Sequence, residues 1–207
     1  AWDQTAGSAS VIVAVLDTGV RSAHPDLAGK LVGGYDFVSN EAGEPAISND
    51  GDGRDADPSD PGDWLTPSEI NADPAFWEGC EASSSSWHGT MVSGIIGAAT
   101  GNGAGMAGTG WNVRVMPVRV LGKCFGYTSD IQAAMKWAAG IAVPGVPNNP
   151  NPAKVINLSL GSAARPCDPD WSDAVAQVNA RGAVVVVAAG NSAGRAASSP
   201  ANCPGVI

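Results

Sequence analysis

The sequence predicts an α/β fold, in which a parallel sheet carries helices on both faces. Short β-branched apolar runs, such as "VIVAVLD" at 11–17 and "VVVVAA" at 184–189, are typical of strands that are buried on both faces. Segments with helical periodicity lie between these runs. Strands that alternate with helices form right-handed βαβ units, and such units build parallel sheets.

The expected elements follow in order along the chain. We expect strands at 11–17, 31–38, 113–120, 155–160 and 183–189, and helices at 89–99, 128–139 and 170–181. Ser129 is expected to cap the helix at 128–139, and Gly182 to end the helix at 170–181. The residues expected to face inward on these two helices are Ile131, Ala134, Met135, Ala138, Trp171, Ala174, Val175 and Val178.

Residues 40–86 interrupt the alternation of strands and helices. They are rich in Asp, Gly, Pro and Ser and show little periodicity. We expect a long surface insert with one short helix near 67–71. Loops of this length are usually functional or flexible. Since no linker divides the chain, we treat residues 1–207 as one domain that carries this insert.

Charge and hydropathy exclude several classes of function. The net charge is −9, and the basic residues are scattered singly, so no surface for nucleic acid is expected. The longest apolar run, at 184–189, is too short to span a bilayer. We therefore expect neither nucleic-acid nor membrane partners. No signal-peptide pattern occurs, which fits a mature chain as well as a cytoplasmic one.

Four cysteines form no C-x-x-C pair, so zinc or thioredoxin-like chemistry is not expected. An even number in an acidic chain rich in Ser, Gly and Asn favours two disulfides and an oxidising compartment over four free thiols. Three pairings are possible. We favour Cys80–Cys124 and Cys167–Cys203, because each pair then joins cysteines that are neighbours along the chain.

Polar residues follow the ends of three expected strands. Asp17 ends the first strand, Ser159 and Gly161 lie at the end of another, and Asn191 follows the last. Ligands bind at the carboxyl ends of parallel strands, so these residues are candidates for one site. A buried Asp17 carboxylate needs a hydrogen-bond donor or a cation, although a strand-end Asp can also serve only as a turn cap.

The chain has two histidines, which we interpret differently. His24, in "HPDL", is interpreted as a turn residue. His88 comes directly before a Gly-rich helix, and the positive end of a helix dipole disfavours protonation of the ring, which suits a general base. Near the last strand, Asn191 places an amide N–H₂ where it could stabilise an oxyanion.

Five motifs occur in a fixed order: "VAVLDTGV", "HPDL", "HGTMVSG", "INLSLG" and "VVVAAGN". In this order and spacing they resemble the subtilase family of subtilisin-like serine peptidases, over residues 11–191. The disulfides and the acidic insert are similar to those of secreted subtilases from Gram-negative bacteria. This resemblance implies a subtilisin-like fold, a secreted, extracellular endopeptidase, and an extended polypeptide as its substrate.

The resemblance also implies roles for individual residues. Asp17 matches the triad aspartate, His88 the general base, and Asn191 the oxyanion-hole asparagine. The residues that match the substrate-binding strands and the walls of the specificity pocket are Leu121, Gly126, Tyr127, Ser159, Leu160, Gly161, Ala189 and Gly190. Cys124 could anchor the rim of this cleft.

The family's nucleophile lies in a "GTSMA"-type motif, and this sequence has none. Family members also carry a segment before the first core strand that is missing here. We therefore expect a partial peptidase domain, incomplete at both ends, that is inactive alone because the nucleophilic serine lies outside it. A second chain could carry the rest of the domain. "SSPANCPGVI", at 198–207, resembles the beginning of a further strand.

Calcium is the one cofactor that the sequence suggests, as a structural ion. Six acids lie in one run of the insert, although the run does not fit the EF-hand pattern and could be a solvated loop. These candidates are Asp50, Asp52, Asp55, Asp57, Asp60 and Asp63. Separately, Asp26 and Asn102 resemble side-chain ligands of a family calcium site whose third ligand would precede this chain.

Two alternatives remain at this point. "DTG" also occurs in aspartic peptidases, but these need two such motifs or a symmetric dimer, and the βαβ pattern does not suit their β-rich fold. The other alternative is a pseudo-peptidase or a calcium- or peptide-binding fragment that keeps the cleft without catalysis.

Overall fold

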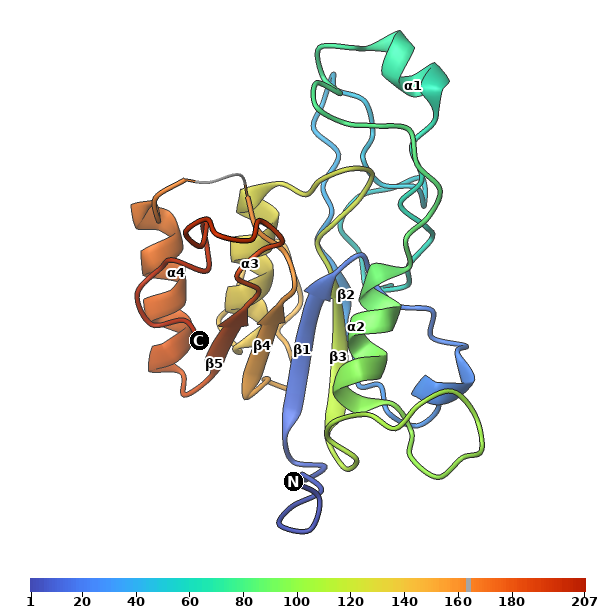
Figure 1. The fold of residues 1–207 in the computed structure, drawn as a ribbon. Helices are drawn as coiled ribbons and strands as arrows, with labels where there is room; N and C mark the ends of the chain where they lie inside the picture. Colours follow the sequence, from blue (N-terminus) through green and yellow to red (C-terminus); the bar gives the residue numbers. More distant parts are fainter. Residues whose placement is uncertain (163–164) are drawn as a thin grey trace.

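The computed structural model describes residues 1–162 and 165–207. Within them the chain forms a five-stranded parallel sheet in the order β2-β3-β1-β4-β5 (Figure 1). The strands are β1 (Ile12–Asp17), β2 (Tyr35–Asp36), β3 (Arg114–Arg119), β4 (Val155–Leu158) and β5 (Val184–Val187). The helices are α1 (Pro67–Ala72), α2 (His88–Gly97), α3 (Thr128–Ala138) and α4 (Pro169–Ala180), with the 3-10 turn η1 (Pro25–Leu27).

Strand β1 lies at the centre of the sheet and ends at Asp17. Its register pairs Asp17 with Arg119 of β3, and Leu16 with Leu158 of β4. Five of its six residues are buried, as the continuous apolar run predicted. The carboxyl ends of the three inner strands therefore meet at one edge, where the sequence predicted a site.

Helices cover both faces of the sheet, which confirms the predicted α/β class. Helix α2 packs on β1 and β3, whereas α3 packs against β1 and α4 against β5 on the other side (Figure 1). The inward faces predicted for α3 and α4 are confirmed, since all eight residues named for them are buried. They join the main core with residues such as Leu16, Met116 and Ile156, whose exposed fractions are 0%.

Two local predictions were wrong. The strand expected at 31–38 is reduced to β2 and an isolated bridge between Leu31 and Val115, because Gly33 and Gly34 take positive φ angles of 50° and 125° and break the extended backbone between the two. Ser129 does not cap α3. The helix begins at Thr128, and its N-cap residue, Tyr127, makes no side-chain cap hydrogen bond. Gly182, with a φ of 74°, follows the end of α4 as predicted.

Residues 40–86 stand on the carboxyl edge of the sheet and contain α1 (Figure 1). Helix α1 begins with a capping box, in which the side chain of Thr66 accepts from the Glu69 amide and Glu69 accepts from the Thr66 amide. A second small core holds the insert together, formed by Val38, Ile47, Leu65 and Trp77. The insert therefore packs as an ordered part of the structure.

Both favoured disulfides are present, Cys80–Cys124 and Cys167–Cys203. The first joins the insert to the segment after β3, and the second joins the beginning of α4 to the C-terminal segment. That segment pairs with β5 through a parallel bridge between Val206 and Val185, as expected for the beginning of a further strand. Among the described residues, no helix has the length and apolar character needed to cross a membrane.

Candidate active site

Asp17 and His88 form a hydrogen-bonded pair at the carboxyl edge of the sheet. The Nδ1 atom of His88 lies 2.8 Å from Oδ1 and 2.9 Å from Oδ2 of Asp17. Asp17 is fully buried, and its Oδ1 also accepts a hydrogen bond of 2.8 Å from the Thr18 amide. The His88 side chain is 41% exposed. A buried carboxylate thus orients an imidazole whose other nitrogen is accessible from the cleft.

The two residues meet because β1 ends where α2 begins. Asp17 is the last residue of β1, and His88 is the first residue of α2. Gly89 allows the close approach, since a Cβ atom at this position would lie 2.1 Å from the carbonyl oxygen of Gly19 and 3.1 Å from the Cβ of Asp17. The "HGT" and "DTG" motifs are therefore two halves of one contact.

Electrostatics favour the protonated form of His88. The hydrogen bond that His88 donates to Asp17, and the negative charge of Asp17, raise the pKa of the imidazole above its ordinary value, whereas partial burial lowers it and Asp63 adds a smaller increase. This reverses the direction expected from the helix dipole, because a direct hydrogen bond to a carboxylate outweighs the partial charge of a helix end. The pair can therefore accept and hold a proton.

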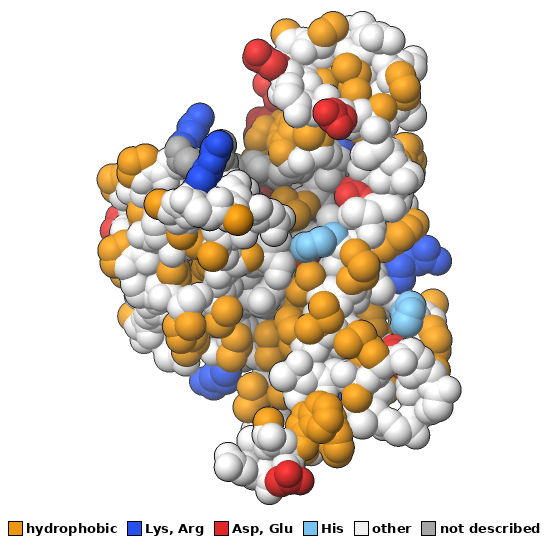
Figure 2. Space-filling model, viewed as in Figure 1, with side chains coloured by type: hydrophobic (Ala, Val, Ile, Leu, Met, Phe, Trp, Pro, Cys, Tyr) orange, Lys and Arg blue, Asp and Glu red, His pale blue; other side chains and the backbone are white. Residues whose placement is uncertain are grey.

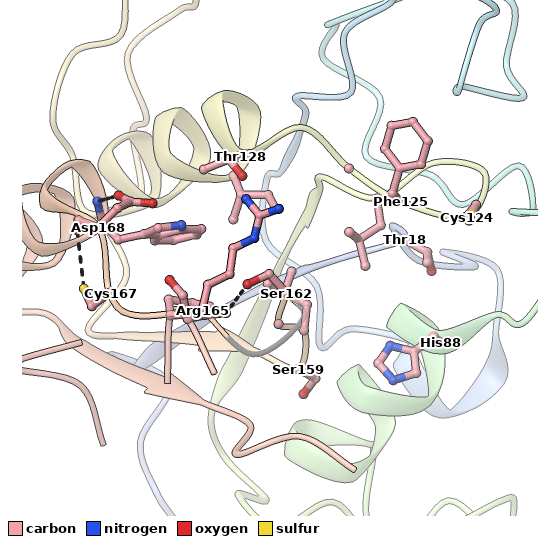
Figure 3. A pocket seen from close by; sticks show the side chains of 18 of the residues that line it. Thr18, His88, Cys124, Phe125, Thr128, Ser159, Ser162, Arg165, Cys167 and Asp168 are labelled. Atoms are coloured by element: carbon pink, nitrogen blue, oxygen red, sulfur yellow. Dashed lines mark hydrogen bonds between the residues drawn. The ribbon is translucent and has the colours of Figure 1, made fainter. Parts of the chain in front are cut away.

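A cleft runs past His88, between α2 and the insert on one side and α3, α4 and β5 on the other. Figure 2 shows this hollow on the molecular surface, with a histidine at its rim. It contains two cavities, of about 810 and 500 Å³, and His88 lines both. In Figure 3, Thr18, Cys124 and Phe125 lie on the same side as His88, and Arg165, Cys167 and Asp168 lie on the opposite side.

The larger cavity lies between the segment after β3 and the segment after β4. Leu121 and Gly126 line one wall, and Ser159, Leu160 and Gly161 line the other, as the resemblance implied. A glycine is required at 126, because a Cβ atom there would lie 2.1 Å from the carbonyl oxygen of Val120.

The smaller cavity brings Asn191 to the same site as His88. Its lining includes Asn191, Ala189 and Gly190 after β5, together with the segment 159–161 after β4. Gly190 has a φ of 92°, which turns the chain sharply after the strand. The amide of Asn191 is exposed and can donate into this cavity.

Tyr127 lies apart from both cavities. Its hydroxyl donates a hydrogen bond of 2.9 Å to Glu44 of the insert, and its ring packs edge-on against Phe125. Burial and the neighbouring Glu44 raise the pKa of Tyr127 to about 12. The side chain therefore joins the segment after β3 to the insert, and only the backbone of this residue remains for the substrate-binding role that we expected.

The candidate calcium ligands fall into two groups. Asp26 is buried, and its oxygens accept from the Asn102 side chain at 2.8 Å and from the Met106 amide at 2.7 Å, which lowers its pKa. Asp26 and Asn102 thus lie together, as implied. His24, interpreted as a turn residue, caps η1 by accepting from the Asp26 amide.

The six acids of the insert do not converge. Asp50 pairs with Arg119, whereas Asp55, Asp57 and Asp60 each accept from the backbone amide two residues onward. Asp63 accepts twice from Ser86, and the Asp52 carbonyl accepts from Asn40. Across the described residues, no three or more His, Cys, Asp or Glu side chains group as a metal site requires.

Sequence reasoning missed several residues of the site. Thr18, Ser86 and Asp63 line the larger cavity beside His88, and Trp171 and Arg165 line its far end. Thr18 and Ser86 are close in sequence to Asp17 and His88, which is the one signal that could have identified them. Asp63 has no such signal, because it reaches the site only through the fold of the insert.

Comparisons with known proteins agree with this geometry. The model of the subtilase family matches residues 8–207. An extracellular protease of Xanthomonas campestris is 48% identical over all of this chain and 34% of its own length, and an extracellular basic protease of Dichelobacter nodosus is 41% identical over all of this chain and 33% of its own length. The chain thus spans about a third of these curated relatives.

A solved structure supports the same assignment. A structure titled as proteases from Pseudoalteromonas arctica matches the whole chain with a TM-score of 0.89 and 46% identity, and the match covers 57% of that structure's chain. Family model, relatives and fold therefore agree. The chain belongs to the subtilase family.

Proposed function

We propose that the protein is a subtilisin-like serine endopeptidase, whose Asp–His–Ser triad takes Asp17 and His88 from this chain and its serine from polypeptide outside residues 1–207. The observation that carries the proposal is the hydrogen bond between His88 Nδ1 and the buried Asp17 carboxylate at the edge of a cleft. Within residues 1–162 and 165–207, the Nε2 atom of His88 makes no hydrogen bond, which leaves this atom for the nucleophile.

In the proposed mechanism His88 acts first as general base and then as general acid. Because Asp17 accepts the Nδ1 proton, neutral His88 keeps its lone pair on Nε2. This nitrogen takes the hydroxyl proton of the serine as its oxygen attacks the peptide carbonyl, and later gives that proton to the departing amine. Asp17 stays ionised and stabilises the imidazolium.

The cleft supplies the rest of the site. An extended peptide would pair with the backbone at 159–161 on one side and with that at 124–126 on the other, since both segments line the larger cavity. Asn191, which shares the smaller cavity with His88, would donate its side-chain N–H to the developing oxyanion. The glycines at 161 and 190 would leave room for a substrate side chain.

We also propose that the protein is secreted and acts outside the cell, on a polypeptide substrate. The two relatives are named as extracellular, and both disulfides form, which suits an oxidising compartment. The serine and the remaining part of the domain would come from the same longer protein or from a second chain.

A structural calcium ion is the cofactor that we propose. Asp26 and Asn102 fit one by chemistry, since a carboxylate and a side-chain amide oxygen are ligands that calcium prefers. The Asn102 amide group would have to turn its oxygen inward, because its nitrogen now donates to Asp26. Such an ion would join the turn at η1 to the loop that contains Asn102.

Peptide hydrolysis by the isolated 207-residue chain tests the location of the nucleophile. We expect no hydrolysis above a sample without protein. Hydrolysis that the wild-type chain and His24→Gln perform, and that His88→Gln abolishes, would show that these residues already contain the nucleophile.

One observation favours a second candidate, a peptide-binding fragment without catalysis. Both cavities are built from residues within this chain. Titration calorimetry with an uncleaved extended peptide would detect such binding. Binding together with an inactive longer protein would support this second candidate over the peptidase.

A further inference from the structure

The first turn of α2, which presents His88, lacks an ordinary cap. Trp87 occupies the N-cap position in the left-handed conformation, with a φ of 54°, and makes no side-chain cap hydrogen bond. A bulky residue in this conformation is costly, and the first amides of a helix have no partner within the helix. Other groups must therefore hold this turn in place.

Two hydroxyl groups take over the role of the cap. The Ser86 hydroxyl oxygen accepts from the His88 amide at 3.2 Å. The Thr18 hydroxyl oxygen accepts from the Gly89 amide at 3.0 Å. The amides of two consecutive residues at the beginning of the helix are thus satisfied by two side chains.

Each hydroxyl in turn donates to a carboxylate of the insert. The Ser86 hydroxyl donates to Asp63 Oδ2 at 2.7 Å, and the Ser86 amide donates to Asp63 Oδ1 at 2.6 Å. The Thr18 hydroxyl donates to Asp60 Oδ2 at 2.7 Å. Because an ionised acceptor fixes and polarises the hydroxyl that it binds, each oxygen is directed at its helix amide.

We propose that Asp60 and Asp63 are positioning residues for His88, which hold the first turn of α2 through the hydroxyls of Thr18 and Ser86. The chains of contacts are Asp60–Thr18–Gly89 and Asp63–Ser86–His88. The importance of this role for catalysis rests on the proposed function of His88. The positioning itself is a property of the chain and can be measured without a substrate.

The insert can hold these carboxylates because it is itself fixed beside the site. Asp60 is 5% exposed, and its second oxygen accepts from the Gly62 amide at 2.8 Å. Just beyond Asp63, Leu65 pairs with Ser83, which places Asp63 next to the segment that leads into α2. Carboxylates of the insert therefore help to fix the position of His88, although they are distant from it in sequence. This role is separate from the calcium role predicted for the acidic run.

Hydrogen exchange of the His88 and Gly89 amides, followed by NMR on the 207-residue chain, tests the proposal. We expect Ser86→Ala to speed exchange at His88 by about tenfold, as for the loss of one hydrogen bond, and Thr18→Val to do so at Gly89. Asp63→Asn and Asp60→Asn should each give a smaller increase at the matching amide, because a neutral acceptor replaces an ionised one.

Conservative variants and a matched control separate positioning from general loosening. Ser86→Thr and Thr18→Ser keep the hydroxyl and should restore slow exchange. Asp57→Asn removes the same charge from an exposed turn of the insert that does not reach α2, and should change neither amide. The Nδ1 proton resonance of His88 should weaken in Ser86→Ala and Asp63→Asn, and should stay unchanged in Asp57→Asn.

Three results would overturn the proposal: unchanged exchange at His88 in Ser86→Ala, an Asp57→Asn effect as large as that of Asp63→Asn, or no rescue by Ser86→Thr. If Thr18→Val does not fold, the Ser86 and Asp63 variants decide the matter, because they lie at the surface. Altered positioning in a longer protein that proves catalytically inactive would refute the proposed function and leave this inference intact.

Discussion

The carbonyl oxygen of Gly19 occupies the space into which a side chain at Gly89 would project. A Cβ atom on Gly89 would lie 2.1 Å from this oxygen, well inside contact distance. Both backbone segments are held in place. The Thr18 amide donates to Asp17, and the Gly89 amide donates to the Thr18 hydroxyl. The distance between Asp17 and His88 thus depends on the absence of a side-chain methyl group at Gly89.

Gly89→Ala should therefore displace His88 from Asp17. Overpacking of this kind commonly lowers the free energy of unfolding by about 1–3 kcal/mol, and urea unfolding would measure the change. Gly94→Ala is the matched control on the same helix, because its Cβ would meet only the Met106 sulfur at 3.9 Å. That variant should be neutral or more stable, as alanine favours helix. Equal effects of the two variants would contradict this account of Gly89.

Asp17→Asn should lower the pKa of His88. The folded pKa of His88 lies above its value of 6.5 in the unfolded chain, chiefly because of the Asp17 hydrogen bond. The stability that His88 contributes is therefore fully present below pH 6.5 and is lost as the pH rises through the folded pKa. NMR titration of the His88 ring should show the decrease, and the pH dependence of unfolding above 6.5 should flatten. An unchanged titration midpoint would contradict the assignment.

Loss of the Cys80–Cys124 disulfide should loosen one wall of the cleft. The bond closes a loop of 44 residues and joins the insert to the segment that contains Gly126. Replacing both cysteines by alanine should lower the free energy of unfolding by about 4 kcal/mol, as the chain-entropy estimate gives for a loop of this size. Denaturant unfolding measures it. A decrease no larger than that of an exposed alanine substitution would mean that the insert holds this wall without the disulfide.

Calcium binding should raise the thermal stability of the protein. With calcium bound at Asp26 and Asn102, chelation should lower the melting temperature of the wild-type chain, and Asn102→Ala should remove most of the difference between the two conditions. Asp52→Asn would show whether the insert contributes. A melting temperature that is indifferent to the chelator would refute a calcium role for both groups of residues.

Much of the fold, and the pairing of Asp17 with His88, could be predicted from the sequence. The strands show as continuous apolar runs, and the polar residues that follow them identify the edge of the sheet where Asp17 and Asn191 lie. This works because parallel strands buried on both faces tolerate few polar residues before their carboxyl ends. The two disulfides were also predictable, since each joins cysteines that are consecutive in the sequence.

The contacts that the insert makes with the site could not be predicted from the sequence. In the sequence, Asp60 and Asp63 are two of six acids in one run. Their spacing does not show that Asp60 accepts from the Thr18 hydroxyl and Asp63 from the Ser86 hydroxyl. The same limit applies to Tyr127, whose hydroxyl binds Glu44. Contacts between an irregular segment and a distant helix depend on tertiary packing, which leaves no periodic signal. The direction of the His88 pKa shift could also not be predicted from the sequence, because it depends on the hydrogen bond between His88 and Asp17.

The most direct test of the account is peptide hydrolysis by the longer protein that contains this domain, measured as kcat/KM for wild type, His88→Gln and His24→Gln. If His88 is the general base of an Asp–His–Ser triad, His88→Gln should reduce kcat/KM by about 10⁴-fold or more, and His24→Gln should leave it within a few-fold of wild type. An active wild type whose His88→Gln variant stays within about tenfold of it would contradict the catalytic role of the Asp17–His88 pair.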